Sequence, residues 1–439
     1  MRCLWAFCDW GNKMNKFCQF AATGAILVGG VAHLAGCVSG WPLKPGELAA
    51  SSDDGASTSS SPSSSTAALS VSERIACVLV EGKVQCWGDN ISGGVGNGES
   101  HTDTPSPAEV LGITGGATAV ATGGVHTCAI LNGGLKCWGW NHRGQLGNGT
   151  VSLESPVPVQ VFGLESGVTA IATGREHSCA IVEGGARCWG LNHQGQLGND
   201  DTVGSPIPMQ VLGLESGVTA IASSEDHTCA LVNGEAKCWG YNDAGQLGND
   251  DFNITVKGRC PDGDGIAHHG LREVYSRIPV PVKGLQGEVT AIGAGSLHTC
   301  AVVSGAVQCW GDNSDGQLGN NDLSVTGSAN PVPVVGLEAG VTALAVGGRN
   351  ACAIVNGTVK CWGDNSNGQL GSNADGQANS PIPVPVVGLD SSITAVGISF
   401  RHACVVVGSE VRCWGDNDEG QLGNGGYTAS KVPVRAKLR

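Results

Sequence analysis

Fourteen of the nineteen cysteines form pairs whose two members stand nine residues apart, and each second cysteine is followed by Trp-Gly. Paired thiols can form a disulfide or bind zinc. Zinc sites usually combine two Cys-x2-Cys knuckles, whereas this spacing brings only two ligands together. We therefore interpret the pairs as disulfides. They are Cys77 and Cys86, Cys128 and Cys137, Cys179 and Cys188, Cys229 and Cys238, Cys300 and Cys309, Cys352 and Cys361, and Cys404 and Cys413.

Each cysteine pair brackets one predicted β-hairpin. The middle of the second pair is Asn132-Gly133, a dipeptide typical of two-residue hairpin turns, and the other pairs carry comparable turn dipeptides at this place. Counting outward from the turn places Cys128 opposite Cys137 at a non-hydrogen-bonded site. Opposed Cα atoms at such sites lie about 4.5 Å apart, which a disulfide tolerates. The sequence therefore predicts seven cross-strand disulfides.

The hairpins belong to seven repeat units, whose first cysteines are separated by 51, 51, 50, 71, 52 and 52 residues. Each unit offers four short β candidates: a segment like residues 168–172, the two cysteine-bearing strands, and a segment like residues 156–161. Prolines in the last segment suit an edge strand. Four strands in each of seven units predict an all-β fold, a seven-bladed β-propeller over residues 66–439.

The N-terminal residues predict export. Residues 1–36 place basic side chains ahead of an apolar run, the layout of a secretory signal. The run ends in Leu34-Ala35-Gly36-Cys37, which resembles the bacterial lipobox and implies cleavage before Cys37 and acylation of its thiol. The competing interpretation, an uncleaved anchor helix, needs about 20 apolar residues, more than residues 20–36 provide. Export also agrees with the cysteine pairs, since disulfides persist outside the reducing cytosol.

The segment after the lipobox has too little apolar content to fold. Residues 37–65 are rich in serine and predict a flexible tether with a mean span of roughly 30 Å. By the familiar sorting rule for such proteins, Val38 rather than Asp after Cys37 favours the outer membrane. We therefore expect a lipid-anchored protein of the bacterial cell envelope, on its periplasmic or its surface side.

Composition and motifs exclude several functions. The net charge of -14, with only 14% charged residues, offers no basic face for nucleic acid. No Gly-x-Ser-x-Gly, His-Glu-x-x-His or P-loop motif is present. The acidic stretches 311–316 and 416–420 lack the alternating carboxylates of a calcium loop and predict turns instead. We expect no catalysis, no cofactor and no metal site.

Two stretches of the third unit are similar to a known repeat. They are Gly174-Arg-Glu-His177-Ser-Cys-Ala180 and Trp189-Gly-Leu-Asn192-His-Gln-Gly195-Gln-Leu-Gly198. This pattern resembles the repeat of the regulator of chromosome condensation family, which implies a seven-bladed propeller over residues 66–439. Family members include a nuclear exchange factor for a small GTPase and a secreted bacterial inhibitor of β-lactamase. An exported lipoprotein would not meet a nuclear GTPase, so no exchange activity is carried over.

This chain departs from the family repeat at several places. The cysteine pairs are additions, and Ile75 and Asn350 replace the repeat histidine. Residues 93–96 read Gly-Gly-Val-Gly instead of Gly-Gln-Leu-Gly in the first unit, and the fourth unit carries an insertion. The shared positions predict scaffold roles, because scaffold needs are equal in every unit.

The tryptophan and histidine of the repeat recur once per unit and are therefore interpreted as structural. We expect the tryptophans to pack between blades. For the histidines, a hydrogen bond to a neighbouring blade is favoured over a metal ring in the central channel. The histidines are His126, His177, His227, His298 and His402.

One position differs between units in a way that suggests function. After Trp-Gly, four units carry aspartate, whereas three consecutive units carry Trp140, Leu191 and Tyr241, with His142 and His193 close by in two of them. Adjacent exposed aromatic residues mark interfaces. We therefore hypothesise a partner-binding sector formed by these five residues. The alternative is that neighbouring loops cover them.

The insertion in the fourth unit, residues 251–275, adds about twenty residues to one loop. Cys260, Asp262, Asp264, His268 and His269 stand in it. A plain surface loop is favoured over a partner-contact loop and over a metal site. After removal of the leader, which holds three cysteines, Cys37 and Cys260 are the cysteines outside the seven pairs, and Cys260 could pair between chains.

These observations predict an exported, lipid-anchored, disulfide-stapled propeller. We expect it to act as a protein-binding or scaffold module in a bacterial envelope, held to the membrane through Cys37, with an unidentified protein as its partner. A secreted enzyme inhibitor is the alternative within the same class. An enzyme or a nucleotide-exchange factor is less favoured.

Overall fold

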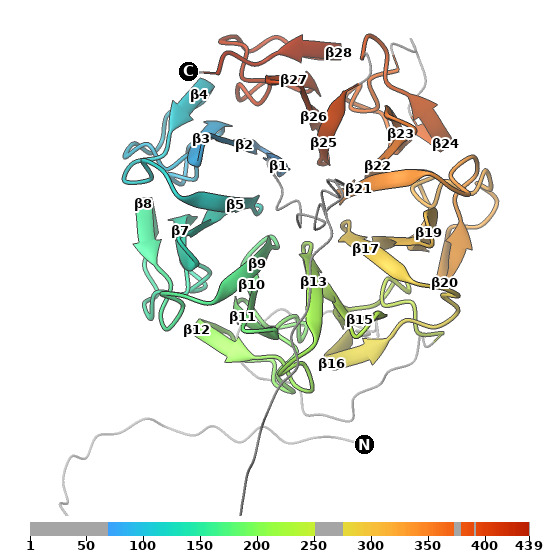
Figure 1. Ribbon diagram of the computed structural model, residues 1–439, viewed down its shortest axis with the longest axis horizontal. Coiled ribbons are helices and arrows are strands. Elements are labelled where there is room, and N and C mark those ends of the chain that lie inside the picture. The colour runs from blue at the N-terminus through green and yellow to red at the C-terminus, as the bar shows by residue number, and fades with distance from the viewer. Residues whose placement is uncertain (1–68, 251–274, 373–378, 390–391, 439) are drawn as a thin grey trace, which may run out of the picture. The chain divides into compact units, whose positions relative to one another are not determined.

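Seven four-stranded sheets stand around a common axis (Figure 1). The computed structural model describes residues 69–250, 275–372, 379–389 and 392–438, which contain 28 strands. Each sheet consists of four antiparallel strands that follow one another in the chain. We number the sheets as blades one to seven in chain order. The predicted seven-bladed propeller is thus confirmed.

The first two strands of each blade lie nearest the axis. The innermost strands are β1 (Leu69–Val71), β5 (Ala117–Thr122), β9 (Val168–Thr173), β13 (Val218–Ser223), β17 (Val289–Ala294), β21 (Val341–Gly347) and β25 (Ile393–Ile398). The second strands are β2 (Ile75–Val80), β6 (His126–Leu131), β10 (His177–Val182), β14 (His227–Val232), β18 (His298–Val303), β22 (Asn350–Val355) and β26 (His402–Val407). The second strands are the most buried, and, like the third strands, each has a paired strand on both sides.

The last two strands of each blade lead to the rim. The third strands are β3 (Lys83–Gly88), β7 (Gly134–Trp140), β11 (Gly185–Gly190), β15 (Glu235–Tyr241), β19 (Ala306–Asp312), β23 (Thr358–Asp364) and β27 (Glu410–Gly415). The outermost strands are β4 (Thr104–Glu109), β8 (Glu154–Gln160), β12 (Ser205–Gln210), β16 (Tyr275–Pro281), β20 (Gly327–Pro333), β24 (Asn379–Pro385) and β28 (Ser430–Arg435). These outermost strands carry the prolines, as predicted for edge strands.

The second and third strands of each blade form the hairpin that the cysteine spacing predicts. In blade two, Asn132 and Gly133 have φ values of 51° and 79°, as a primed hairpin turn requires. This turn sets the register that places Cys128 opposite Cys137. Their Cα atoms are 4.0 Å apart, and all seven predicted pairs form disulfides.

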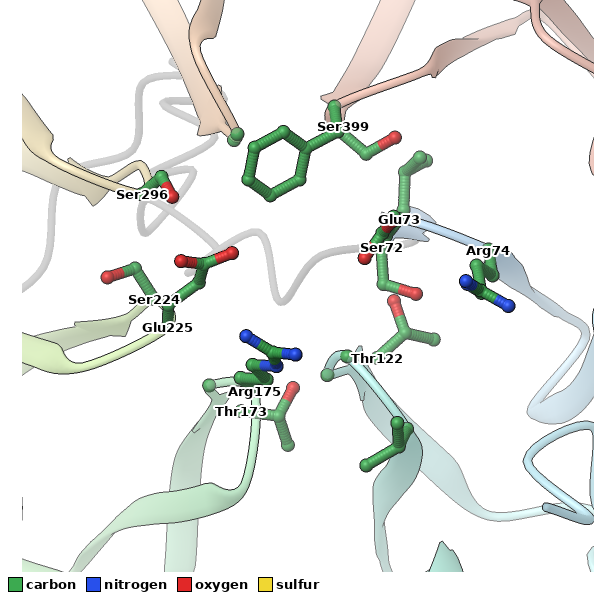
Figure 2. Close-up of a pocket in the computed structure, with 18 of the residues that line it drawn as sticks. Ser72, Glu73, Arg74, Thr122, Thr173, Arg175, Ser224, Glu225, Ser296 and Ser399 are labelled. Carbon is green, nitrogen blue, oxygen red and sulfur yellow. The ribbon is translucent and has the colours of Figure 1, made fainter. Parts of the chain in front are cut away.

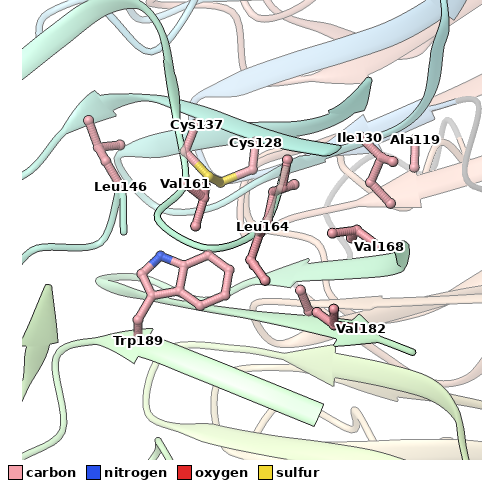
Figure 3. Packing of buried hydrophobic residues seen from close by; sticks show 12 residues of the cluster. Ala119, Cys128, Ile130, Cys137, Leu146, Val161, Leu164, Val168, Val182 and Trp189 are labelled. Carbon is pink, nitrogen blue, oxygen red and sulfur yellow. A yellow bond between two sulfur atoms is a disulfide. The ribbon is translucent and has the colours of Figure 1, made fainter. Parts of the chain in front are cut away.

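The hydrophobic core is divided among the seven interfaces between blades. In one of them, the Cys128–Cys137 disulfide of blade two packs with Leu146 of the same blade and with Trp189 of blade three (Figure 3). The side chains of Cys128, Leu146 and Trp189 are all fully buried. Each disulfide therefore fixes a hairpin and also provides surface for the next blade.

The ring closes by side-chain packing and by hydrogen bonds across the seam, such as that from the Gly425 backbone N–H to the Pro105 carbonyl at 2.8 Å. Among the described residues, blade one contains only β1–β4 and blade seven only β25–β28, so no described strand is exchanged between the two blades. Leu69 and Trp87 of blade one share a buried cluster with Cys404 and Leu422 of blade seven. The question of which strand closes the propeller, open from the sequence, is thereby answered. Within the described residues, no helix is long and apolar enough to cross a membrane.

Candidate functional site

Two sets of loops meet on one end of the propeller, which we call the loop face. The inner loops join the first and second strands of each blade, and the outer loops join the third and fourth strands. In blade two, the backbone N–H of Trp140 in the outer loop donates to the carbonyl of Val125 in the inner loop at 3.0 Å. The same bond recurs in all seven blades. The position after Trp-Gly is therefore held against the inner loop in every blade.

The repeat tryptophans belong to the scaffold. Trp189 is fully buried, and its indole N–H donates to the carbonyl of Gln145 in the preceding blade at 2.9 Å. The corresponding bond is present at every interface, between 2.8 and 3.0 Å. The prediction that these residues pack between blades is confirmed.

Three repeat histidines also link neighbouring blades. His126 Nε2 lies 2.7 Å from the hydroxyl of Ser178 in the next blade, and that hydroxyl donates to the carbonyl of Gln145 at 3.0 Å. Because the hydroxyl proton is engaged, the imidazole must donate its own. His177 and His227 make the same link at 2.9 Å. Burial lowers the pKa of all three to about 3.

The other two histidines lack this link to a hydroxyl. Blade six offers Ala351, and blade one Ala76, where blades two to five carry a hydroxyl. Neither nitrogen of His298 forms a hydrogen bond of standard geometry, and in His402 only Nδ1 does. Burial lowers the pKa of both to about 4. The backbone of the next blade, at Asn350 and Glu73 respectively, nevertheless raises the pKa of each against the effect of burial. Over the described residues, no three His, Cys, Asp or Glu side chains gather closely enough to hold a metal ion.

Aspartate after Trp-Gly caps the outer loop. In blade five, the carboxylate of Asp312 accepts hydrogen bonds from the Ser314 hydroxyl and the Gln317 side-chain amide, both at 2.7 Å. Blade six repeats this with Asp364 and Gln369 at 2.9 Å. The acidic sequences are thus turns, as predicted.

Blades two, three and four lack this cap, because Trp140, Leu191 and Tyr241 replace aspartate. The side-chain amide nitrogens of Gln145 and Gln246 are buried without a hydrogen-bond partner, and that of Gln196 uses Asp226 of blade four at 3.3 Å. An unpaired buried amide costs about 1–3 kcal/mol. The scaffold therefore does not favour the apolar residues at these positions.

The bond from the loop glutamine amide to the aspartate after Trp-Gly is also missing in one blade that has the aspartate. In blade seven, Asp416 pairs with Arg401 at 3.0 Å. The amide nitrogen of Gln421 in this blade then has no partner. The missing bond in blade seven thus follows from a competing ion pair, whereas in blades two and four no carboxylate is present at the position.

Four of the predicted sector residues are half-buried, and His193 is exposed. The Trp140 ring packs against the His142 ring, with centroids 4.9 Å apart. Leu153 extends the sector outward in blade two. Its carbonyl accepts a hydrogen bond from the backbone N–H of Asn141, and its side chain is 71% exposed. The loop face thus carries apolar groups over three consecutive blades.

The positive and negative side chains that face each other across blade interfaces swap loops between this sector and the opposite half of the ring. At the interface of blades two and three, the outer-loop Arg143 faces the inner-loop Glu176 at 3.6 Å. At the interface of blades five and six, the outer-loop Asp315 faces the inner-loop Arg349 at 3.1 Å. The sector therefore differs from the opposite half of the ring in charge order as well as in apolar content.

A cavity of about 320 Å³ lies at the axis on the loop face (Figure 2). The inner loops of all seven blades line it, and Trp140 lies at its edge. Arg175 and Glu225 project into it from neighbouring blades. Burial raises the pKa of Glu225, although the Ser296 hydroxyl and Arg175 oppose that shift.

No signal that recurs in the repeat points to this cavity. Its variable side chains stand two residues before the repeat histidine, where the seven units carry five different residue types. Comparing this position across units would have found them. They are Glu73, Gly124, Arg175, Glu225, Ser296, Gly348 and Phe400.

Two predicted features fall elsewhere. Cys37 and Cys260 lie outside the described residues. Strand β15 ends at Tyr241 and β16 begins at Tyr275, so the insertion belongs to the outer loop of blade four.

Comparison with known proteins gives one family. The repeat described as "Regulator of chromosome condensation (RCC1) repeat" matches residues 132–181, 183–231, 233–302 and 356–406. A second pattern of the same description matches residues 117–145, 168–196, 218–246 and 289–317.

Among curated proteins, the ultraviolet-B receptor UVR8 of Arabidopsis thaliana is 28% identical over 372 residues, covering 81% of this chain and 78% of the receptor. The human E3 ubiquitin-protein ligase HERC2 is 27% identical over 374 residues, which are 83% of this chain but only 6% of the ligase.

Two solved structures share the fold. One is the crystal structure of Kap60 bound to yeast RCC1 (Prp20), with a TM-score of 0.68, 20% identity and 85% of each chain covered. The other is human WBSCR16, with a TM-score of 0.67, 20% identity, and coverage of 81% of this chain and 95% of that one.

Proposed function

The chain belongs to the regulator of chromosome condensation repeat family, and we propose that it is an exported, lipid-anchored member that binds a protein partner through its loop face. Binding of a protein partner is consistent with the family, since yeast RCC1 was solved with Kap60 bound. The sector of Trp140, Leu191, Tyr241, His142 and His193 is the part specific to this chain.

One observation supports the sector most strongly. Where four blades cap the outer loop with aspartate, three consecutive blades place Trp140, Leu191 and Tyr241, and two buried glutamine amides lose their partner. A residue that costs the scaffold a hydrogen bond needs another reason to be there. Large apolar side chains beside exposed Leu153 provide one, because interfaces are centred on such groups.

Export and lipidation have separate support. Leu34-Ala35-Gly36-Cys37 follows an apolar run, and seven cross-strand disulfides favour an oxidising compartment. The tether of residues 37–65 would let the propeller stand off the membrane surface by roughly 30 Å. We propose the bacterial envelope, on the outer membrane, as the location.

The sector is tested by changing Trp140, Leu191 and Tyr241 together to aspartate. The tagged protein is expressed in its own bacterium, cross-linked in intact cells and purified from the membrane fraction. We expect the wild-type protein to yield a defined cross-linked partner that the triple variant loses. The outer loops should still fold in this variant, because aspartate stands naturally at this position in four blades.

A matched control carries three aspartates at exposed apolar positions outside the sector: Leu111→Asp, Val335→Asp and Val387→Asp. These side chains are 51%, 46% and 44% exposed and follow the outermost strands. The control should retain the partner. An unchanged partner on the triple sector variant would contradict the proposal.

A further inference from the structure

The axial cavity is a second recognition element on the loop face, distinct from the apolar sector around it. Its volume of about 320 Å³ lies at the lower end of the roughly 300–1,000 Å³ typical of ligand pockets. The inner loops of seven different blades close around it, so a group that enters meets rigid walls on all sides. Such a cavity suits one side chain from a partner protein.

Carboxylates dominate the charges that the cavity leaves available. Arg74 lines the wall, but its guanidinium is held by Asp89 at 3.2 Å and by Glu419 at 3.0 Å. Glu73 has only Arg401, at 3.9 Å, and Arg401 lies closer to Asp416, at 3.0 Å. The wall near blade one therefore offers a weakly neutralised carboxylate.

Glu225 is the main carboxylate that a cation in the cavity could neutralise. Its carboxylate projects into the cavity (Figure 2) and forms no ion pair with any residue that the structure describes. Burial raises its pKa, which means that its charge is poorly solvated. Arg175 on the adjacent blade lowers this pKa only in part and is itself exposed, with no ion pair among the described residues. A half-buried carboxylate that Arg175 and the Ser296 hydroxyl compensate only in part gains from a cation brought by a ligand.

Two further polar atoms belong to residues of the cavity wall. The hydroxyl of Ser223 and the indole N–H of Trp140 both belong to cavity residues, are buried, and have no hydrogen-bond partner. Both atoms are shielded from solvent, so they can report on a bound group, whereas the exposed Arg175 can donate to backbone carbonyls of an entering peptide. Trp140 thus belongs to both the cavity and the apolar sector.

We propose that the axial cavity receives a lysine or arginine side chain of the partner protein, with Glu225 as its main counter-ion and Glu73 as the second. This rests on the proposed binding function of the loop face and names the chemistry of the partner. The shared chemistry is a protonated amine or guanidinium. A free basic amino acid carries it too, and the experiment separates the two sources.

The probe is a capped tripeptide, N-acetyl-Gly-Arg-Gly-amide, titrated into the isotopically labelled wild-type protein. Binding is followed by the NMR signal of the Trp140 indole N–H, assigned by its loss in Trp140→Phe. We expect a saturable shift with the arginine and lysine peptides and none with N-acetyl-Gly-Glu-Gly-amide. Glu225→Gln should weaken binding at least tenfold, because it removes the charge and keeps the shape.

The matched control is Glu183→Gln, which removes the same charge from a hairpin turn at the opposite end of blade three. It should leave the affinity unchanged. Equal binding of the glutamate peptide, or no effect of Glu225→Gln, would overturn the proposal. Tighter binding of free arginine than of the capped peptide would assign the cavity to a free amino acid and overturn the partner source. The peptide titration needs no partner protein, so its failure is distinguishable from failure of the sector experiment.

Discussion

At the scale of single residues, the repeat histidine has two different environments. In blades two to four, the imidazole Nε2–H donates to a hydroxyl of the next blade at 2.7 to 2.9 Å. His298 instead faces Ala351, and neither of its nitrogens forms a hydrogen bond of standard geometry. Blade six shows another solution, because the side-chain amide of Asn350 donates to the carbonyl of Ser399 at 2.8 Å. Asparagine therefore fits this position when the next blade lacks a hydroxyl.

We predict that His298→Asn keeps or raises stability at neutral pH. Asparagine there can donate to the carbonyl of Gly347, which corresponds to that of Ser399, and it removes two unpaired nitrogens. Urea unfolding at pH 7 should show a free energy of unfolding equal to that of wild type or about 1 kcal/mol higher. A loss above about 2 kcal/mol would contradict this account of the histidine's surroundings.

The pH dependence of stability follows from the same burial. The folded-state pKa of His298 is about 4, below the ordinary 6.5 of the unfolded chain, so below pH 6.5 the unfolded state binds more protons. Stability from this group is fully present above pH 6.5 and is lost as the pH falls toward 4. Each pH unit in that window costs about 1.4 kcal/mol. Between pH 7 and pH 5.5, His298→Asn should therefore lose about 1.4 kcal/mol less than wild type in urea unfolding. Equal losses would show that His298 is protonated in the fold.

At the scale of single elements, each disulfide acts on one hairpin. Replacing Cys128 and Cys137 by alanine should lower the free energy of unfolding by about 3 kcal/mol, because the closed loop no longer restricts the unfolded chain. Urea unfolding of the exported variant measures this. In the single variant Cys128→Ala, the remaining thiol should react with an alkylating agent only after unfolding, since Cys137 is fully buried. Unchanged stability would mean that the bridge does not form in the native protein.

The elements differ in how far the sequence predicts them. The hairpins follow from local chemistry, because a two-residue turn and a fixed cysteine spacing leave one register for Cys128 and Cys137. Scaffold residues such as Trp189 reveal themselves by recurring in every unit. The cavity residues Glu73, Arg175 and Glu225 occupy a position whose residue type varies between units, and they stand on different blades, so their proximity depends on ring closure. The failed histidine bonds depend on Ala351 and Ala76, which lie in the next blade of the ring.

At the scale of the whole molecule, the seam between blades one and seven is held by packing and by side-chain bonds such as that of the Trp87 indole to the Gln421 carbonyl, at 2.8 Å. The inner strand of blade one is only three residues long. Removing either Trp87 or Trp239 should lower the free energy of unfolding by about 3–5 kcal/mol. We expect Trp87→Ala to lower it further than Trp239→Ala, because both blades beside Trp239 have full-length strands. Hydrogen exchange should show blade one opening first in the Trp87 variant, and equal protection in the two variants would contradict a weak seam.

The measurement that tests the central claim most directly is the intact mass of the natively exported protein, before and after thiol alkylation without reductant. An exported binding module predicts a product that begins at acylated Cys37, contains seven disulfides and has one alkylatable thiol, Cys260. A full-length product with fourteen or more free thiols would place the protein in a reducing compartment. That result would contradict both the export and the envelope partner.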